Sequence, residues 1–262
     1  MNQNETHKIG LGMYTVYESV KADMNAAFMQ LAEIGYRGIE FYGEPKDYQV
    51  ERVQQALRTS GLEMTGWHIE WRNLQEGTLG DTIQYLQAVG CPIAIVPCLG
   101  SKWNVGHDSS QECKDRWLFY IEHLNRINEL LQKEGILLGY HNHEHEFQLQ
   151  YDGQSVFDLL FENLDSSVIM ELDTGNCTSA GVNPSEVLRR YRDRNILLHL
   201  KPYSDTKGFD IVLGEAEDAN NWQEILHESD VDFQWLLIES ENQALPEIKN
   251  AELCRKGLEK YI

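Results

Sequence analysis

The feature that most constrains the fold is an alternation of short β-rich runs with longer segments of helical spacing. The runs expected to be strands are Ile9–Tyr14, Gly38–Tyr42, Glu63–His68, Ile93–Pro97, Ile136–His141, Val168–Asp173, Ile196–Leu200 and Trp235–Glu239. A strand–helix repeat that occurs about eight times over this length is typical of a closed parallel barrel rather than an open sheet. The sequence therefore predicts a single (β/α)₈ barrel domain over residues 1–262.

The segments between these runs carry helical periodicity and end on stop signals. In the longest segment, Trp117–Gln132, apolar residues from Leu118 to Leu131 trace one face. Glycines stand where several of these helices should end, and glycine adopts the left-handed conformation there at little cost. They are Gly35, Gly61, Gly90 and Gly135. The stretch Pro202–Asn221 reads as a long loop after the seventh strand, on the face where barrels place their active sites, and is a candidate lid.

Composition excludes several classes of function. The 42 acidic and 22 basic residues give a net charge of -20, which disfavours nucleic-acid binding. The mean hydropathy of -0.47 and the lack of a long apolar run disfavour a membrane span. Glycine-rich phosphate-binding motifs are missing, and residues 1–7 do not resemble a signal peptide. Five scattered cysteines read as free thiols. We expect a cytoplasmic protein without nucleic-acid or membrane partners, and a homo-oligomer remains open.

Polar side chains gather where the fifth strand should end. His141 and His143 share a face by strand alternation, and Glu146 falls in the following turn. Such a density of imidazole and carboxylate directly after the apolar run Ile136–Leu138 is unusual for a solvated loop. The carboxyl ends of barrel strands open onto one shared bowl, so this cluster is a candidate active-site element.

The next three strands also end in side chains that bind metals. Asp173 ends the sixth strand, His199 lies near the end of the seventh and Glu239 ends the eighth. Carboxylates that converge without a cation repel one another, and a metal removes that repulsion. Mixed carboxylate and imidazole ligands suit Mn²⁺ best, with Mg²⁺, Co²⁺ and Zn²⁺ as alternatives. The sequence therefore predicts a divalent-metal centre.

The chain resembles the xylose isomerase-like TIM barrels, a superfamily that holds sugar isomerases and epimerases, inosose dehydratase and endonuclease IV. The resemblance is carried by Gly38–Phe41, Gly66–His68, Val89–Pro97 and the string Tyr140-His141-Asn142-His143-x-x-Glu146-Phe147. It implies that Asp173, His199 and Glu239 are metal ligands. The slot of the fifth-strand ligand falls on His141 by spacing, and Glu146 is the alternative. Asn176 stands where some epimerases have a histidine. Pro202 stands where an aspartate often follows the His-x-Lys string, which here is His199-Leu200-Lys201.

The chemistry expected of such a centre is proton abstraction beside a carbonyl that the cation polarises, through a metal-stabilised enediolate. Glu146 and Glu239 are the first candidates for base and acid, and His143 is the third. The side chains expected to contact substrate are Tyr14, Glu40, Trp67, His68, Trp103, Asn176 and Lys201. For Trp67 a plain core role is an equal alternative, and His107 reads as a loop residue.

The sequence leaves several functions open. The first is an isomerase or epimerase of a small unphosphorylated sugar or keto-sugar. The second is a lyase or dehydratase that eliminates water or an aglycone from a 3-keto sugar. An endonuclease is less favoured because the net negative charge opposes DNA binding. A non-catalytic sugar-binding barrel is less favoured because Asp173, His199 and Glu239 form an intact ligand set.

Overall fold

The computed structural model describes residues 8–101, 113–228 and 235–262. In this part of the chain eight parallel strands close into a barrel in the order β1-β10-β9-β8-β5-β4-β3-β2. The barrel strands are β1 (Lys8–Gly12), β2 (Gly38–Tyr42), β3 (Glu63–His68), β4 (Ile93–Val96), β5 (Leu137–His141), β8 (Ile169–Asp173), β9 (Ile196–Leu200) and β10 (Trp235–Ile238). The predicted strands and the (β/α)₈ fold are confirmed, with strand ends shifted by at most two residues.

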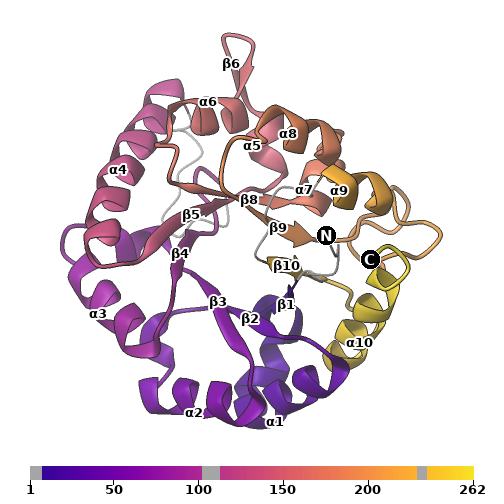
Figure 1. Cartoon of the computed structure of the whole chain (residues 1–262). Coiled ribbons are helices and arrows are strands. Elements are labelled where there is room, and N and C mark those ends of the chain that lie inside the picture. The colour runs from indigo at the N-terminus through magenta and orange to yellow at the C-terminus, as the bar shows by residue number, and fades with distance from the viewer. Residues whose placement is uncertain (1–7, 102–112, 229–234) are drawn as a thin grey trace, which may run out of the picture.

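Helices surround the barrel on the outside, as the view along its axis shows (Figure 1). They are α1 (Tyr17–Ile34), α2 (Val50–Ser60), α3 (Leu79–Val89), α4 (Lys114–Lys133), α5 (Glu144–Gln148), α6 (Val156–Asn163), α7 (Thr174–Ser179), α8 (Pro184–Arg190), α9 (Trp222–Glu228) and α10 (Glu247–Leu258). Three 3₁₀ helices follow strands: η1 (Met13–Val16), η2 (Pro45–Asp47) and η3 (Trp71–Leu74). The short hairpin of β6 (Gln150–Tyr151) and β7 (Gln154–Ser155) projects beyond the ring of helices (Figure 1).

The helix ends follow the expected chemistry. Gly61 caps α2 with φ of 74°, a left-handed conformation that residues with a side chain rarely adopt. Helix α4 begins three residues before the predicted segment Trp117–Gln132 and ends one residue after it. Its apolar stripe is wider than its buried face, because Leu118 and Leu130 are exposed while Leu124 and Leu131 are buried.

The barrel interior changes from apolar to polar along the strands. Ile169, Glu171 and Asp173 are every second residue of β8 and therefore face the same side of the strand. Ile169 belongs to a small interior cluster with Ile93, Ile95, Leu197, Trp235 and Leu237. A Cβ at Gly38 would lie 2.7 Å from the Trp235 ring, so this layer is filled. The polar groups of β8 and β9 lie above it, toward the carboxyl ends of the strands.

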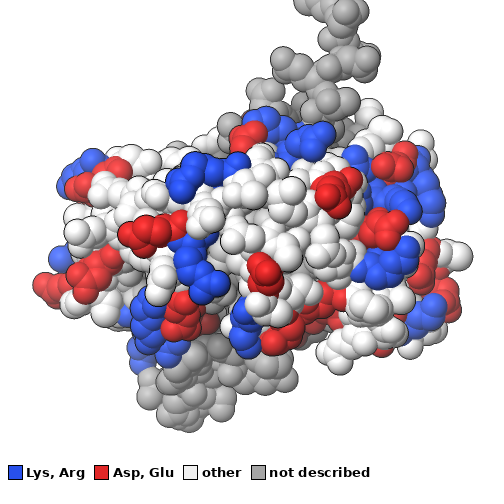
Figure 2. All heavy atoms as spheres, turned by 90° about the horizontal axis from the view of Figure 1, so that it is seen from below, with Lys and Arg blue, Asp and Glu red and all other residues white. Residues whose placement is uncertain are grey.

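On the face that Figure 2 shows, Lys and Arg side chains are interspersed with Asp and Glu rather than gathered in one basic area. Among the described residues, no helix has the length and the apolar character needed to span a membrane.

The loop between β9 and α9 has the expected form. Apart from one isolated bridge between Ser204 and Gly208, residues 201–221 form neither helix nor strand. Its role as a lid stays a prediction. Trp103 and His107 lie outside the described residues.

Candidate metal centre

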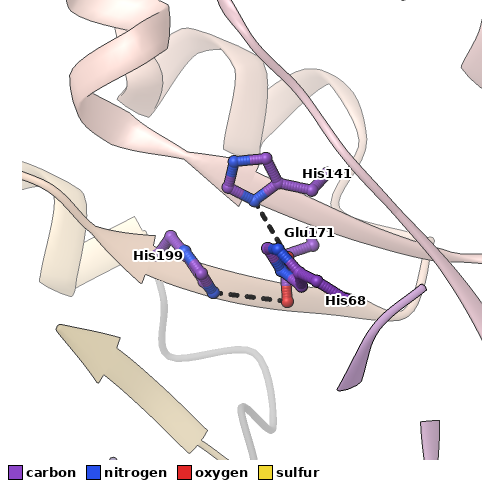
Figure 3. Close-up of side chains that lie close together, drawn as sticks. All are labelled: His68, His141, Glu171 and His199. Atoms are coloured by element: carbon purple, nitrogen blue, oxygen red, sulfur yellow. Dashed lines mark hydrogen bonds and ion pairs between the residues drawn. The ribbon is translucent and has the colours of Figure 1, made fainter. Parts of the chain in front are cut away.

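Two groups of metal-binding side chains meet inside the barrel at the carboxyl ends of the strands. The first, here called the rim group, is Asp173, His199 and Glu239. The second, here called the inner group, is His68, His141, Glu171 and His199 (Figure 3). In each group one ligand atom per residue lies within 4.8 Å of the others, and every member is buried. Both groups share His199.

Asp173 is fixed by the turn that follows β8. Its Oδ1 accepts a hydrogen bond from the Asn176 amide at 2.7 Å, and its own amide donates to Asn142 Oδ1 at 3.0 Å. Asn176 Nδ2 in turn donates to the Asn142 carbonyl at 3.1 Å. Gly175 makes this packing feasible, because a Cβ there would lie 2.7 Å from the Lys201 carbonyl oxygen. Asp173 Oδ2 has no hydrogen-bond partner, and burial raises the pKa of this carboxyl to about 7.

His199 and Glu239 face each other next to Asp173. His199 Nδ1 lies 3.3 Å from Glu239 Oε2 and makes no hydrogen bond. Burial opposes ionisation of Glu239, but the nearby charges of Lys201 and His199 hold the pKa of its carboxyl well below the ordinary value. Glu239 therefore remains an anion at neutral pH, as a ligand for a cation requires.

His141 belongs to the inner group and also approaches the rim group. Its Nδ1 is 2.9 Å from Glu171 Oε2, while its Nε2 is 3.8 Å from Asp173 Oδ2. Burial lowers the pKa of His141, which favours the neutral ring that metals bind. Of the two fifth-strand residues expected to be ligands, His141 thus lies beside the rim group.

Glu171 is the functional candidate that sequence reasoning missed. It lies two residues before Asp173 on β8 and is fully buried, with its two oxygens near His68, His141 and His199. Glu171 lies inside the strand and not at its end, where the other candidate ligands lie. The signal was a carboxylate inside an apolar strand, in phase with Asp173, since a buried carboxylate needs a partner.

Glu40 adds a second buried carboxylate beside His68 and His199 of the inner group. Glu40 Oε2 lies 2.8 Å from His199 Nε2 and 3.0 Å from His68 Nε2. The same His68 nitrogen is 2.9 Å from Glu171 Oε2. Burial works against the charged ring, but Glu40 and Glu171 raise the pKa of His68 to about 10. His68 is therefore a cation between two carboxylates, and the substrate contacts expected of Glu40 and His68 stay predictions.

His143 and Glu146 lie outside both groups. His143 Nδ1 is buried without a hydrogen-bond partner, and burial together with His141 lowers the pKa of the ring well below its ordinary value. Glu146 is fully buried, accepts hydrogen bonds from the Tyr140 hydroxyl at 2.7 Å and the His143 amide at 2.8 Å, and has its pKa raised by burial. The His143 ring is therefore neutral at neutral pH, while both carboxylate oxygens of Glu146 are already engaged.

Lys201 closes the rim group on the side of β9. It is almost fully buried, with Nζ 3.2 Å from Glu239 Oε1 and 3.9 Å from Asp173 Oδ2. It also donates to Glu241 and lies over the Phe209 ring at 4.6 Å. Burial opposes its charge, but Asp173 and Glu239 raise its pKa, so Lys201 is a permanent cation beside the centre.

The remaining expected substrate contacts differ in access. Tyr14 is 45% exposed and packs edge-on against Tyr42. Trp67 is fully buried, is stacked on Phe41, and donates from Nε1 to the Gly43 carbonyl at 2.8 Å. Asn176 is buried and holds Asn142, as described above. Tyr14 is therefore the most accessible of the three.

The rim group fits a divalent cation. Asp173 Oδ2 and His199 Nδ1 are buried polar atoms without hydrogen bonds, and they lie in one group with a Glu239 oxygen. Leaving such atoms unsatisfied costs free energy that a bound cation would recover. Two carboxylates and one imidazole nitrogen are a donor set suited to Mn²⁺, Zn²⁺ or Co²⁺.

Comparisons with known proteins match the chain to a described family and to curated relatives. The model of a family described as "Xylose isomerase-like TIM barrel" matches residues 28–261. A curated inosose dehydratase from Geobacillus kaustophilus is 27% identical over 207 residues. A second, from Clostridium perfringens, is 24% identical over 210 residues. These matches cover 73% of this chain and 64% and 65% of the relatives, so the chain spans less than two thirds of their length.

Solved structures share the fold. A sugar phosphate isomerase/epimerase from Parabacteroides distasonis superposes with a TM-score of 0.77 at 20% identity, covering 98% of this chain and 95% of that one. A D-psicose 3-epimerase from Clostridium cellulolyticum, solved with D-tagatose, gives a TM-score of 0.70 at 14% identity, covering 97% and 98%. At these identities the likeness establishes the barrel and leaves the reaction open.

Proposed function

Because the chain belongs to the xylose isomerase-like TIM barrel family, we propose that it is a divalent-metal-dependent isomerase or epimerase of a small unphosphorylated sugar or keto-sugar. The observation that carries the proposal is the rim group, in which Asp173, His199 and Glu239 offer ligand atoms from three neighbouring strands. We add His141 Nε2 as the fourth ligand, since it lies 3.8 Å from Asp173 Oδ2.

A cation held there would polarise a sugar carbonyl and stabilise the negative charge that develops when the neighbouring C–H loses its proton. The protein must supply the groups that move this proton. We assign His143 and Glu239 to that role: the His143 ring is neutral with an unpaired Nδ1 and Glu239 is held as an anion, so whichever of them takes the proton becomes the acid that returns it. Glu146, which the sequence suggests as a base, accepts a hydrogen bond from the His143 amide and so supports the position of His143.

The charges around the centre favour a substrate without phosphate. Among the described residues, the lysine side chain beside the rim group is Lys201, and Glu239 and Glu241 already pair with it. A phosphate dianion would have to displace one of these carboxylates and approach a chain of net charge -20. Lys201 suits a neutral hydroxyl or the enediolate oxygen better. Tyr14, exposed at the edge of the site, offers a ring face for sugar carbons.

A second candidate function is the elimination of water or an aglycone from a keto-sugar. It is favoured by a specific observation, because the curated relatives that match include proteins named inosose dehydratase. The first step is the same proton abstraction, and the outcome then depends on whether a β-oxygen leaves before the proton returns.

Deuterium exchange separates the two candidates. The protein loaded with Mn²⁺ would be incubated in deuterated water with keto-sugars and 3-keto glycosides, while C–H exchange and product release are followed. Exchange or an epimer without elimination supports the isomerase or epimerase, and loss of water or an aglycone supports the lyase. Asp173→Asn serves as the control, since it keeps the side-chain shape but removes a ligand charge. Metal-loaded protein that does neither with any of these substrates would contradict both candidates.

A further inference from the structure

Two imidazole rings each lie between a carboxylate of the rim group and a buried carboxylate beneath it. His141 directs Nε2 toward Asp173 and Nδ1 toward Glu171, at 3.8 and 2.9 Å. His199 directs Nδ1 toward Glu239 and Nε2 toward Glu40, at 3.3 and 2.8 Å. In both rings one nitrogen points to the rim group and the other to a buried carboxylate beneath it.

A neutral imidazole carries one proton, and this restricts what its two nitrogens can do. The nitrogen that binds a cation uses its lone pair, so the proton must reside on the other nitrogen and needs an acceptor. Glu171 and Glu40 are buried acceptors at hydrogen-bond distance from those far nitrogens. We propose that Glu171 and Glu40 are positioning residues that fix the tautomers and ring orientations of His141 and His199, so that both present a lone pair to the cation in the rim group.

His68 completes this device. Glu40 and Glu171 are buried close together and would repel each other as anions. His68 Nε2 lies 3.0 Å from an oxygen of the first and 2.9 Å from an oxygen of the second. The His68 ring also stacks on His199, with ring centroids 5.7 Å apart. His68 thereby holds both carboxylates in place under the metal-binding rings.

The inner group could instead hold a cation itself, because its ligand atoms also lie within 4.8 Å of one another. That cation would take Nδ1 of His141 and Nε2 of His199. Those are the nitrogens that must carry protons if the rim group binds metal, so the two arrangements exclude each other unless the rings become imidazolates. The unpaired ligand atoms favour the rim group, which has two, Nδ1 of His199 and Oδ2 of Asp173, whereas the inner group has one, Oε1 of Glu171.

Metal affinity tests the positioning role. Mn²⁺ would be titrated into the wild type, Glu171→Gln and Glu40→Gln, with folding checked by circular dichroism. Loss of such a carboxylate partner typically lowers metal affinity about 10–100-fold, and we expect that range for both variants with one ion still bound per chain. Asp158→Asn is the control, because it also removes a carboxylate that pairs with neighbouring side chains, here Tyr191 and Arg190, but it contacts neither His141 nor His199. Unchanged affinity in Glu171→Gln and Glu40→Gln, or an equal loss in the control, would overturn the proposal.

A second measurement reads the tautomers directly. In the Zn²⁺-loaded protein, ¹⁵N spectra of the histidine rings, assigned with single His→Gln variants, should show the proton on Nδ1 of His141 and on Nε2 of His199. The opposite tautomers, or two ions per chain by elemental analysis, would place a cation in the inner group and refute the inference. The inference rests on the proposed metal centre, and the two fail differently. Wild type that binds no metal removes the centre itself, whereas wild-type binding with unaffected variants removes only the positioning role.

Discussion

Replacement of Trp67 by Phe distinguishes a core residue from a substrate contact. Trp67 is fully buried between Phe41, Tyr48 and Tyr85, and its Nε1 donates to the Gly43 carbonyl at 2.8 Å. Phe keeps the stack on Phe41 but removes the pyrrole part of the indole and the hydrogen bond. The geometry therefore predicts a change in stability and leaves substrate affinity intact.

The size of the effect follows from three losses. The hydrogen bond to Gly43 contributes about 1 kcal/mol. The atoms removed forfeit about 1 kcal/mol of transfer free energy. A residual cavity of roughly 40 Å³, at about 24 cal/mol per Å³, adds about 1 kcal/mol. The free energy of unfolding should thus fall by about 3 kcal/mol, which for a chain of this size lowers Tm by roughly 6–12 °C.

Thermal and urea unfolding measure this change, and KM on an identified substrate with bound metal per chain provides the functional comparison. We expect both functional quantities to remain within about twofold of the wild type at a temperature where the variant is folded. A Trp67→Phe protein with wild-type Tm and a KM raised tenfold would refute the reasoning. It would show that the indole contacts the substrate, as the sequence allowed.

Four further predictions follow from the site. Asp173→Ala and His199→Ala should each abolish tight divalent-metal binding in a folded barrel, and elemental analysis that shows wild-type metal in either would contradict the rim group. Glu239→Gln should lower kcat by about 10²–10⁴-fold with a smaller change in KM, so near-wild-type turnover would exclude a role in proton transfer. Tyr14→Ala should raise KM several-fold with little change in Tm, because its ring is 45% exposed, and unchanged KM would remove Tyr14 from the sugar site. Burial and His141 lower the pKa of His143, so its basic form persists through neutral pH and is lost only in acid. The acid limb of kcat/KM should therefore lie below the ordinary histidine pKa of about 6.5, and a limb above it that vanishes in His143→Gln would refute this.

The strand ends were predictable, because the signals that fix them are local. Three predicted strands, Gly38–Tyr42, Glu63–His68 and Ile196–Leu200, match β2, β3 and β9 residue for residue. Strand β1, Lys8–Gly12, shows how far local signals can misplace a strand end. The run expected to reach Tyr14 ends two residues earlier, where η1 begins, and η1 carries the exposed ring of Tyr14.

The sequence by itself determined the barrel and the presence of Asp173, His199 and Glu239 at its rim, because alternation along each strand and the shared direction of the strands place these side chains on one face. It could not decide between His141 and Glu146, which differ by five positions and lie on either side of a turn. Tertiary structure put the His141 ring beside Asp173 and gave both oxygens of Glu146 to Tyr140 and the His143 amide. It also paired Glu171 with His141 and Glu40 with His199, partners that are 30 and 159 residues apart in the chain. Contacts of that separation depend on how the closed barrel brings its strands together around one axis, and no local pattern in the sequence encodes them.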